Sequence, residues 1–133
     1  TRPDPRIRPA DPGLRALELA RALVSAADTH PIQNLRVMNR LKSQFGAEQA
    51  DAVEWNRHWI MLGFAALEAD APGDGFFGGD SPGLADICLV PQMANARRFD
   101  TPLEEFPQLV RLDAALRELP AFAAAAPEAV RPA

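Results

Sequence analysis

The sequence contains no tyrosine, one cysteine and only two histidines among its 133 residues. The single cysteine, Cys88, permits neither an internal disulfide nor a paired-cysteine metal site, and it suits a reducing cytoplasm. The scarcity of histidine and the lack of tyrosine leave few general acids and bases. No nucleophile–base–acid set, phosphate-binding loop or zinc-ligand spacing is present. We therefore expect no catalytic residue and no metal ligand within this chain.

Long apolar runs and an excess of positive charge are also absent. No apolar segment approaches the roughly 20 residues that a membrane-spanning helix needs. The formal net charge is −4, whereas nucleic-acid binding requires a cationic face. The first residues lack the apolar core of a secretory signal peptide. We expect no nucleic-acid partner, no membrane partner and a cytoplasmic location.

The composition favours helices. Thirteen prolines and an alanine-rich sequence indicate helices separated by proline-marked ends. The length suits one domain with a buried core. Apolar spacing predicts helices that start at Pro12, run over 35–45, 48–70 and 84–99, and start again at Pro107, with a short turn from Pro120. The sequence thus predicts an all-α bundle of five to six helices with short loops.

Several local features refine this prediction. The apolar stripe of the first helix consists of Leu17, Ala20, Val24 and Ala27. Pro31 should kink or break this helix, because proline removes a hydrogen bond and biases His30 toward extended geometry. The helix over 48–70 is apolar on two faces, which predicts a central, heavily covered element. Gly46 should cap the helix over 35–45, and Pro127 and Pro132 mark a frayed tail.

The first twelve residues differ from the rest. They contain four prolines and three arginines, which is typical of an extended connector between domains. We expect an interdomain connector over 1–11, a helical domain over 12–133 and a further domain upstream. Within the connector, Arg2, Arg6 and Arg8 are expected to be exposed to solvent. The alternative is that they contact the upstream domain.

The stretch Gly79 to Ile87 predicts a turn followed by a helix start. Asp86 stands at the third helical position, where its carboxylate can accept a hydrogen bond from the free N–H at the cap. The run Leu84 to Val90 is otherwise apolar, so this bond would be buried and costly to lose. Gly83 stands at the cap itself and offers no side-chain oxygen. The capping box is therefore half present.

Two groups of polar residues are candidates for binding. His30 and Asn34 share a face if their segment is helical, and with the free N–H groups of a kinked helix start they could hold an anionic or amide-rich ligand. The alternative is a local cap-and-turn network. Arg36 lies around the helix from Asn34, and a solvated surface role is its default.

Arg97 and Arg98 form the second group. A guanidinium that faces a cleft suits bidentate binding of a carboxylate. The alternative is that these charges complement the C-terminus of their helix. The remaining chemistry-bearing side chains are expected to pack in the core or lie on the surface: Cys88, His58, Trp55 and Trp59.

Together these segments resemble the zeta class of glutathione transferases, the maleylacetoacetate and maleylpyruvate isomerases. The most specific match is the run Ala85-Asp86-Ile87-Cys88-Leu89-Val90-Pro91-Gln92 followed by Asn95-Ala96-Arg97-Arg98-Phe99. The segments His30 to Leu35, Trp59 to Glu68 and Leu119 to Phe122 agree, and residues 2–12 resemble the interdomain connector of that family. The resemblance covers essentially the whole chain.

The resemblance implies a glutathione transferase C-terminal helical domain joined to an upstream thioredoxin-like domain that binds glutathione. It implies a homodimer and a keto-acid substrate of the maleyl type. A glutathione thiolate would add to the cis double bond, and rotation followed by loss of the thiol would give the trans product. Because the thiol-activating half is not in this sequence, we expect the 133-residue chain alone to be inactive.

The resemblance also suggests site residues. His30 and Asn34 match positions near glutathione and substrate, and Arg36 matches an arginine of the maleylpyruvate branch. Arg98 matches a substrate-facing arginine, with Arg97 the second candidate. Gly83 replaces the usual Thr or Ser, which concerns stability and not chemistry. The competing hypothesis is a non-catalytic helical interaction or dimerisation module, in which the apolar, alanine-rich face of the first helix forms the contact.

Overall fold

The structure is a computed structural model that describes residues 7–130, and in this range it is all-α, as predicted. The helices are α1 (Pro12–Leu23), the π-helix η1 (Val24–Thr29), α2 (His30–Ile32), α3 (Leu35–Phe45), α4 (Gln49–Ala69), α5 (Leu84–Arg98), α6 (Pro107–Arg117), α7 (Pro120–Ala124) and α8 (Pro127–Val130). The five longer helices match the predicted ones. Arg2, Arg6, most of the predicted connector and Pro132 lie outside the described residues.

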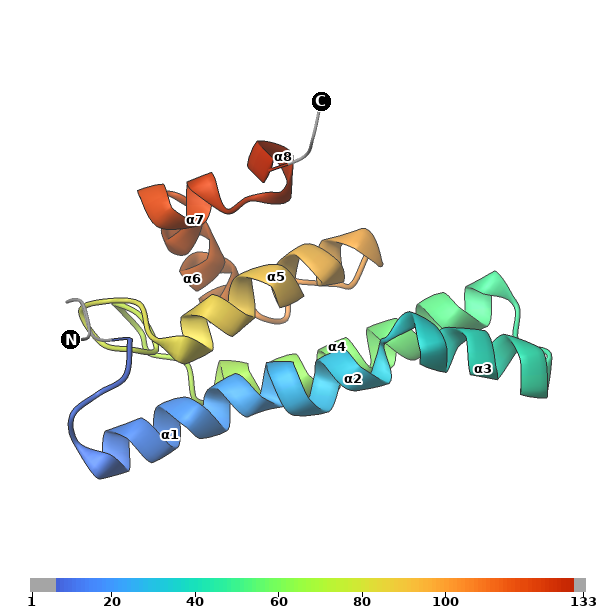
Figure 1. Cartoon of the computed structure of the whole chain (residues 1–133), viewed down its shortest axis with the longest axis horizontal. Coiled ribbons are helices and arrows are strands. Elements are labelled where there is room, and N and C mark those ends of the chain that lie inside the picture. The colour runs from blue at the N-terminus through green and yellow to red at the C-terminus, as the bar shows by residue number, and fades with distance from the viewer. Residues whose placement is uncertain (1–6, 131–133) are drawn as a thin grey trace.

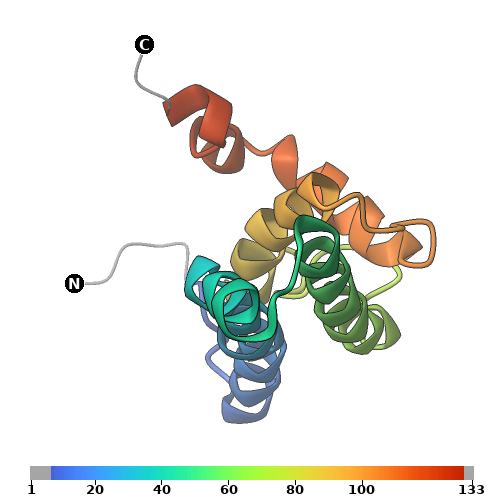
Figure 2. The ribbon, with the colours of Figure 1, turned by 90° about the vertical axis from the view of Figure 1, so that its right-hand side faces the viewer.

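The long axis of the molecule is formed by two antiparallel rods. Figure 1 shows α1, η1, α2 and α3 following one another along this axis, with α4 returning beside them. Helix α5 contacts α1 on one side and α6 on the other, and Figure 2 shows it lying between these two parts. Helix α5 is therefore the central helix of the bundle.

Burial confirms this position of α5 and corrects the prediction for α4. In α5 the side chains of Leu89, Met93 and Ala96 are fully buried. Helix α4 buries one face, but on the other Leu62 remains 56% exposed. The heavily covered central helix is thus α5, whose buried face includes polar residues and so gives a weak apolar pattern. The apolar spacing that predicted α6 is that of Leu109, Leu112 and Leu116, and all three are fully buried.

The buried face of α1 also differs from the apolar stripe. Leu17 is 42% exposed, and Ala20 and Ala27 are exposed as well. The residues that face the bundle are Glu18, Ala22, Ser25 and Thr29. Their spacing of four, three and four is helical, but three of the four are polar. An apolar pattern therefore could not find this face.

A π-helical turn replaces the break predicted at Pro31. His30 has φ −63° and ψ −44°, so the expected extended geometry is wrong, and its N–H donates to the carbonyl of Ser25, five residues back. A proline in a regular helix would clash with the carbonyl four residues earlier, and the wider π turn relieves this clash. The helical path ends at Ile32, and Asn34 caps the next helix, α3.

The close approach of this turn to α4 depends on a glycine. Thr29 is buried, and a Cβ added to Gly63 would lie 2.3 Å from its hydroxyl oxygen. A glycine at this position leaves the space that the Thr29 side chain occupies. Gly63 therefore allows Thr29 of η1 to pack closely against α4.

The start of α5 is held as the capping motif predicts. Asp86 is fully buried, and its carboxylate accepts from the backbone N–H groups of Phe77, Gly78 and Gly83 at 3.0, 3.0 and 2.8 Å. It therefore anchors both the helix start and the preceding loop. The cap oxygen that Gly83 lacks comes from another helix, because Glu18 Oε1 on α1 accepts from Ala85 N at 2.9 Å.

A second helix start is capped in the same way. Glu68 on α4 accepts from Gln108 N and Leu109 N of α6, both at 2.9 Å. One correction concerns the C-terminal end: Pro127 begins the short helix α8 where a frayed tail was expected, whereas α7 begins at Pro120 as predicted. Gly46 caps α3 in the left-handed region, as predicted. Within residues 7–130 none of the helices has the length and hydropathy to cross a membrane.

Candidate functional site

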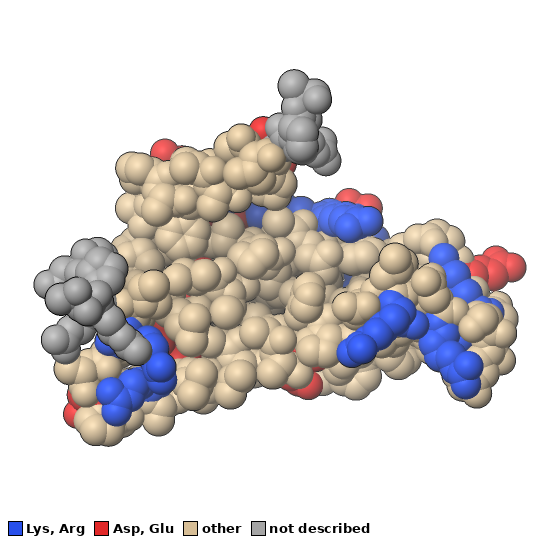
Figure 3. All heavy atoms as spheres, viewed as in Figure 1, with Lys and Arg blue, Asp and Glu red and all other residues tan. Residues whose placement is uncertain are grey.

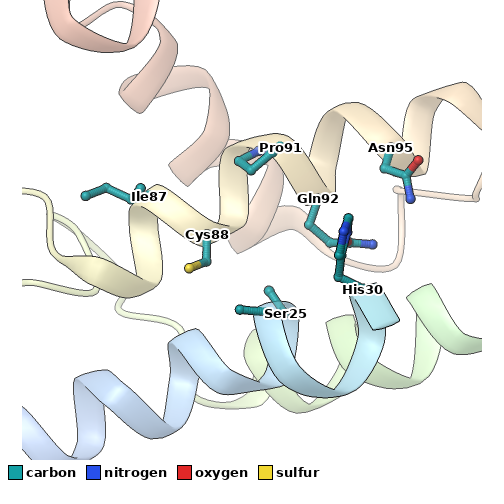
Figure 4. Close-up of a pocket in the computed structure, with 8 residues that line it drawn as sticks. Ser25, His30, Ile87, Cys88, Pro91, Gln92 and Asn95 are labelled. Carbon is teal, nitrogen blue, oxygen red and sulfur yellow. The ribbon is translucent and has the colours of Figure 1, made fainter. Parts of the chain in front are cut away.

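A cavity of about 380 Å³ lies between the η1–α2 segment and α5. Its walls are Ser25, Ala26 and His30 on one side and Ile87, Cys88, Pro91, Gln92 and Asn95 on the other. Figure 4 shows Cys88 and Gln92 extending from α5 toward the η1–α2 segment, with His30 beside Gln92. A cavity of this size is in the range of small-molecule sites.

The cavity has an apolar and a polar end. Ile87, Pro91 and Ala26 supply carbon surface, whereas His30, Gln92 and Asn95 supply hydrogen-bonding groups. None of the described residues that line it is a lysine or an arginine. The wall is therefore neutral and amphipathic, and it suits a ligand with both apolar and hydrogen-bonding parts.

A buried amide cluster supports the polar end. Gln33, in the turn between α2 and α3, is only 9% exposed. Its Oε1 accepts from Gln92 Nε2 at 3.1 Å and from Asn95 Nδ2 at 2.7 Å. Both donors belong to residues that line the cavity. Gln33 thus fixes the orientation of two side chains in the cavity wall from behind.

The turn that carries Gln33 is itself held from α4. Trp55 donates its indole N–H to the carbonyl of Ile32 at 3.1 Å. Its ring contacts that of Trp59 edge to face, with centroids 5.8 Å apart. Both tryptophans are half-buried. Trp55 therefore links α4 to the turn, in addition to the packing role that the sequence predicted.

The structure separates His30 from Asn34. His30 lines the cavity, but α2 ends at Ile32, so the two residues do not share one helix. The Asn34 side chain accepts from Arg36 N at 3.1 Å and caps α3. For Asn34 the structure shows the cap interaction that sequence analysis kept as the alternative. Arg36 is exposed.

The two arginines at the end of α5 have different surroundings, and neither lines the cavity. Arg97 donates to Asp113 Oδ2 on α6 at 2.5 Å, and Asp113 is buried. Arg97 therefore ties α5 to α6. Arg98 is exposed and stacks over the Phe99 ring, with 5.8 Å between its guanidinium carbon and the ring centroid.

Cys88 is half-buried: it packs against the core, as predicted, and also lines the cavity. Burial raises the pKa of its thiol, and the charge of Glu18 raises it further. At neutral pH the thiol is therefore protonated and a poor nucleophile. The prediction of an unreactive cysteine fits this environment.

Positive charge gathers away from the cavity. Helix α3 carries Arg36, Arg40 and Lys42, and Figure 3 shows basic side chains spread over this end of the molecule. Among the described residues no cluster of three histidines, cysteines or carboxylates could hold a metal ion. Any electrostatic attraction of an acidic ligand must therefore come from outside the cavity wall.

Sequence analysis missed Ser25, Gln33 and Gln92. These neutral side chains carry no charge or motif that points to a site. The spacing of Gln92 and Asn95 was the one available signal. They are three residues apart, so they share a face of α5. The contribution of Gln33 depends on a tertiary contact and has no local signature.

Comparison with known proteins adds to this geometry. Residues 42–120 match the family model described as the glutathione S-transferase C-terminal domain. A probable maleylacetoacetate isomerase of Vibrio cholerae is 44% identical over 96% of this chain and 60% of its own length. The holo structure of a zeta-class maleylpyruvate isomerase, a bacterial glutathione S-transferase, has a TM-score of 0.92 and 43% identity, covering 96% of this chain and 62% of its own.

A third relative was solved with ligands in its active site. It is the maleylacetoacetate isomerase of Anaeromyxobacter dehalogenans, with bound dicarboxyethyl glutathione and citrate. Its TM-score is 0.88 and its identity 41%, over 96% of this chain and 57% of its own. The chain thus spans about three fifths of the length of the relatives that it matches.

Proposed function

The chain belongs to the glutathione S-transferase C-terminal domain family, and on this basis we propose that it forms the helical half of a glutathione-dependent cis–trans isomerase. The substrate would be a keto acid with a maleyl group, as in the names of the zeta-class relatives. The observation that carries the proposal is the amphipathic cavity. One wall comes from the run 85–99, which resembles the isomerases most specifically, and His30 on the opposite wall begins the matching segment 30–35.

The residues of the cavity fit parts of both ligands. Glutathione contains peptide amides, which hydrogen-bond well with the amide and imidazole groups of Gln92, Asn95 and His30. When bound, glutathione supplies a thiol that adds reversibly to the double bond, so that the bond can rotate. The role of this chain is to bind and orient the ligands and to cover them from water with the apolar surface of Ile87 and Pro91.

The remaining predicted residues keep a proposed role that rests on the resemblance. We propose that Asn34 and Arg98 contact glutathione or substrate in the whole protein, and that Arg36 contributes if the substrate is maleylpyruvate. Arg97 is the weakest candidate, because its guanidinium already pairs with Asp113. An acidic substrate would gain from such cations outside the neutral cavity wall.

The domain organisation and assembly are part of the same proposal. Residues 1–11 would connect to an upstream thioredoxin-like domain that activates the thiol, and the protein would be a cytoplasmic homodimer. The exposed leucines of α1, with Leu14 59%, Leu17 42% and Leu23 45% exposed, support a contact between copies. Sedimentation of the whole protein tests this part, and a monomer at micromolar concentration would contradict it.

The same exposed leucines favour the second candidate function, a helical interaction or dimerisation module without catalysis. One assay separates the two functions. The whole protein is mixed with maleylpyruvate or maleylacetoacetate, with and without glutathione, and formation of the fumaryl product is followed. We expect turnover only when glutathione is present. Turnover without glutathione, or none with either substrate, would overturn the proposed isomerase.

A further inference from the structure

We propose that Gln33 is a positioning residue for the ligand that occupies the cavity, acting through Gln92 and Asn95. The effect on kinetics rests on the proposed function, whereas the effect on the orientation of Gln92 and Asn95 does not. Gln33 does not line the cavity. It lies behind the wall, and its carbonyl oxygen accepts from both amide groups, at 3.1 and 2.7 Å.

The geometry limits what the two wall residues can do. A side-chain amide presents nitrogen on one edge and oxygen on the other. Because the Gln92 and Asn95 nitrogens both donate to one oxygen, neither amide can turn over without losing that bond. The Gln33 carbonyl thus selects one arrangement of donors and acceptors at the polar end of the cavity. A site built in this way holds its ligand groups in a fixed orientation before binding.

The turn that bears Gln33 is well placed for this task. Its backbone N–H donates to the carbonyl of His30 at 3.1 Å, so the turn is continuous with the helix that carries the cavity histidine. Trp55 holds the adjacent carbonyl of Ile32 from the other side. The turn at Ile32 and Gln33 therefore joins α2, α4 and α5 behind the site.

The two ends of the Gln33 side-chain amide differ in their bonding. Nε2 is buried and has no hydrogen-bond partner among the described residues, and a buried donor without a partner is destabilising. The carbonyl oxygen makes both bonds to the cavity wall. Positioning of the wall therefore depends on the oxygen and not on the nitrogen. Glutamate can provide the same acceptor without losing any bond made by Nε2.

The test uses the whole protein and three variants. Gln33→Met removes the acceptor at similar volume, Gln33→Glu keeps an acceptor, and Gln44→Met makes the same change on the exposed face of α3. NMR of the side-chain amides reports hydrogen exchange at Gln92 and Asn95. We expect slow exchange in the wild type, in Gln33→Glu and in Gln44→Met, and fast exchange in Gln33→Met. Unchanged exchange in Gln33→Met would overturn the proposal.

Kinetics test the consequence for the ligand. Gln33→Met should lower kcat/KM about tenfold, the effect expected for losing one or two neutral hydrogen bonds. In an Asn95→Ala background the same change should have a much smaller effect, because both residues act as one unit. Independent, multiplicative effects would overturn the proposal. If the wild type shows no isomerase activity, the proposed function fails, and the amide exchange alone decides the role of Gln33.

Discussion

At the scale of single residues, Glu18 and Gly83 depend on each other. Gly83 has no side chain to cap α5, and Glu18 supplies the oxygen from α1. A Cβ added to Gly83 would lie 2.1 Å from that same oxygen. Because Gly83 has no Cβ, the Glu18 carboxylate has room to reach the start of α5. The two residues form one capping unit that spans two helices.

This pairing predicts a coupled effect on stability. Gly83→Ala should lower the free energy of unfolding by about 2 kcal/mol, because the new methyl group displaces Glu18 from a buried helix start. In a Glu18→Ala background the same change should have much less effect. Urea unfolding measures both values. Gly73→Ala is the matched control, since nothing lies within 4 Å of a Cβ there, and additive effects would contradict the pairing.

The buried carboxylate of Glu18 also predicts a pH dependence. Burial raises its pKa above the ordinary value of 4.5, and the neighbouring Asp86 charge raises it further, against the lowering effects of the Ala85 N–H and Arg21. The folded state therefore binds this proton more tightly than the unfolded state. The stability that Glu18 contributes is present below pH 4.5 and is lost as pH rises through the raised folded pKa.

The variant Glu18→Gln isolates this effect, because it keeps a side-chain acceptor but cannot ionise. The unfolding free energy of wild type relative to Glu18→Gln should fall as the pH increases above 4.5. Urea titrations at a series of pH values measure the difference. A difference that grows in favour of the wild type over this range would show that the charge of Glu18 is stabilised and not strained.

Sequence analysis found some of these residues and missed others for physical reasons. Asp86 was predictable because its partner N–H groups are local, at the start of its own helix. Glu18 was not, since its partner lies 67 positions away and an acid on an apolar helix is normally exposed. His30 lines the cavity, and its contact with a ligand stays a prediction. The ion pair of Arg97 with Asp113 had no signal in the sequence, because Asp113 belongs to another helix.

At the scale of elements, helix starts in this bundle are stabilised from neighbouring helices. Helix α6 begins at Pro107 without a side-chain cap of its own, and Glu68 of α4 accepts from two of its free N–H groups. Each such contact fixes both the start of one helix and its position against another. This links local capping to the packing of the bundle.

Removing the Glu68 carboxylate should therefore lower the free energy of unfolding by more than is usual for a half-buried side chain. We expect Glu68→Ala to lower the free energy of unfolding by about 2–3 kcal/mol, since two N–H groups lose a charged acceptor. Glu54→Ala, an exposed change on the same helix, is the control and should change stability by less than about 0.5 kcal/mol. Equal effects in thermal or urea unfolding would disprove the capping role.

Helix boundaries were largely predictable and the path at Pro31 was not. The starts at Pro12 and Pro107 and the Gly46 cap have local signatures, and the structure has them where they were expected. The π turn has no local signature, because it depends on the packing of Thr29 against Gly63 and on the proline that follows it. A local rule predicts a break at such a proline, but tertiary packing keeps the chain helical to Ile32.

At the scale of the molecule, the bundle brings two distant segments to one cavity. The η1–α2 segment and α5 are separated by some 50 residues in the chain, yet they form opposite walls (Figure 4). The all-α class and the family were predictable from periodicity and from the run 85–99. The cavity itself was not, because which face of α1 turns inward is decided by buried polar residues that an apolar pattern does not reveal.

The most direct test of this account is a crystal structure of the whole protein with dicarboxyethyl glutathione, the molecule that the Anaeromyxobacter dehalogenans relative holds in its active site. We predict that the bound molecule enters the cavity between α2 and α5, with polar atoms at hydrogen-bond distance from His30, Gln92 or Asn95. A bound molecule that contacts none of these residues and leaves the cavity unfilled would contradict the assignment of the site.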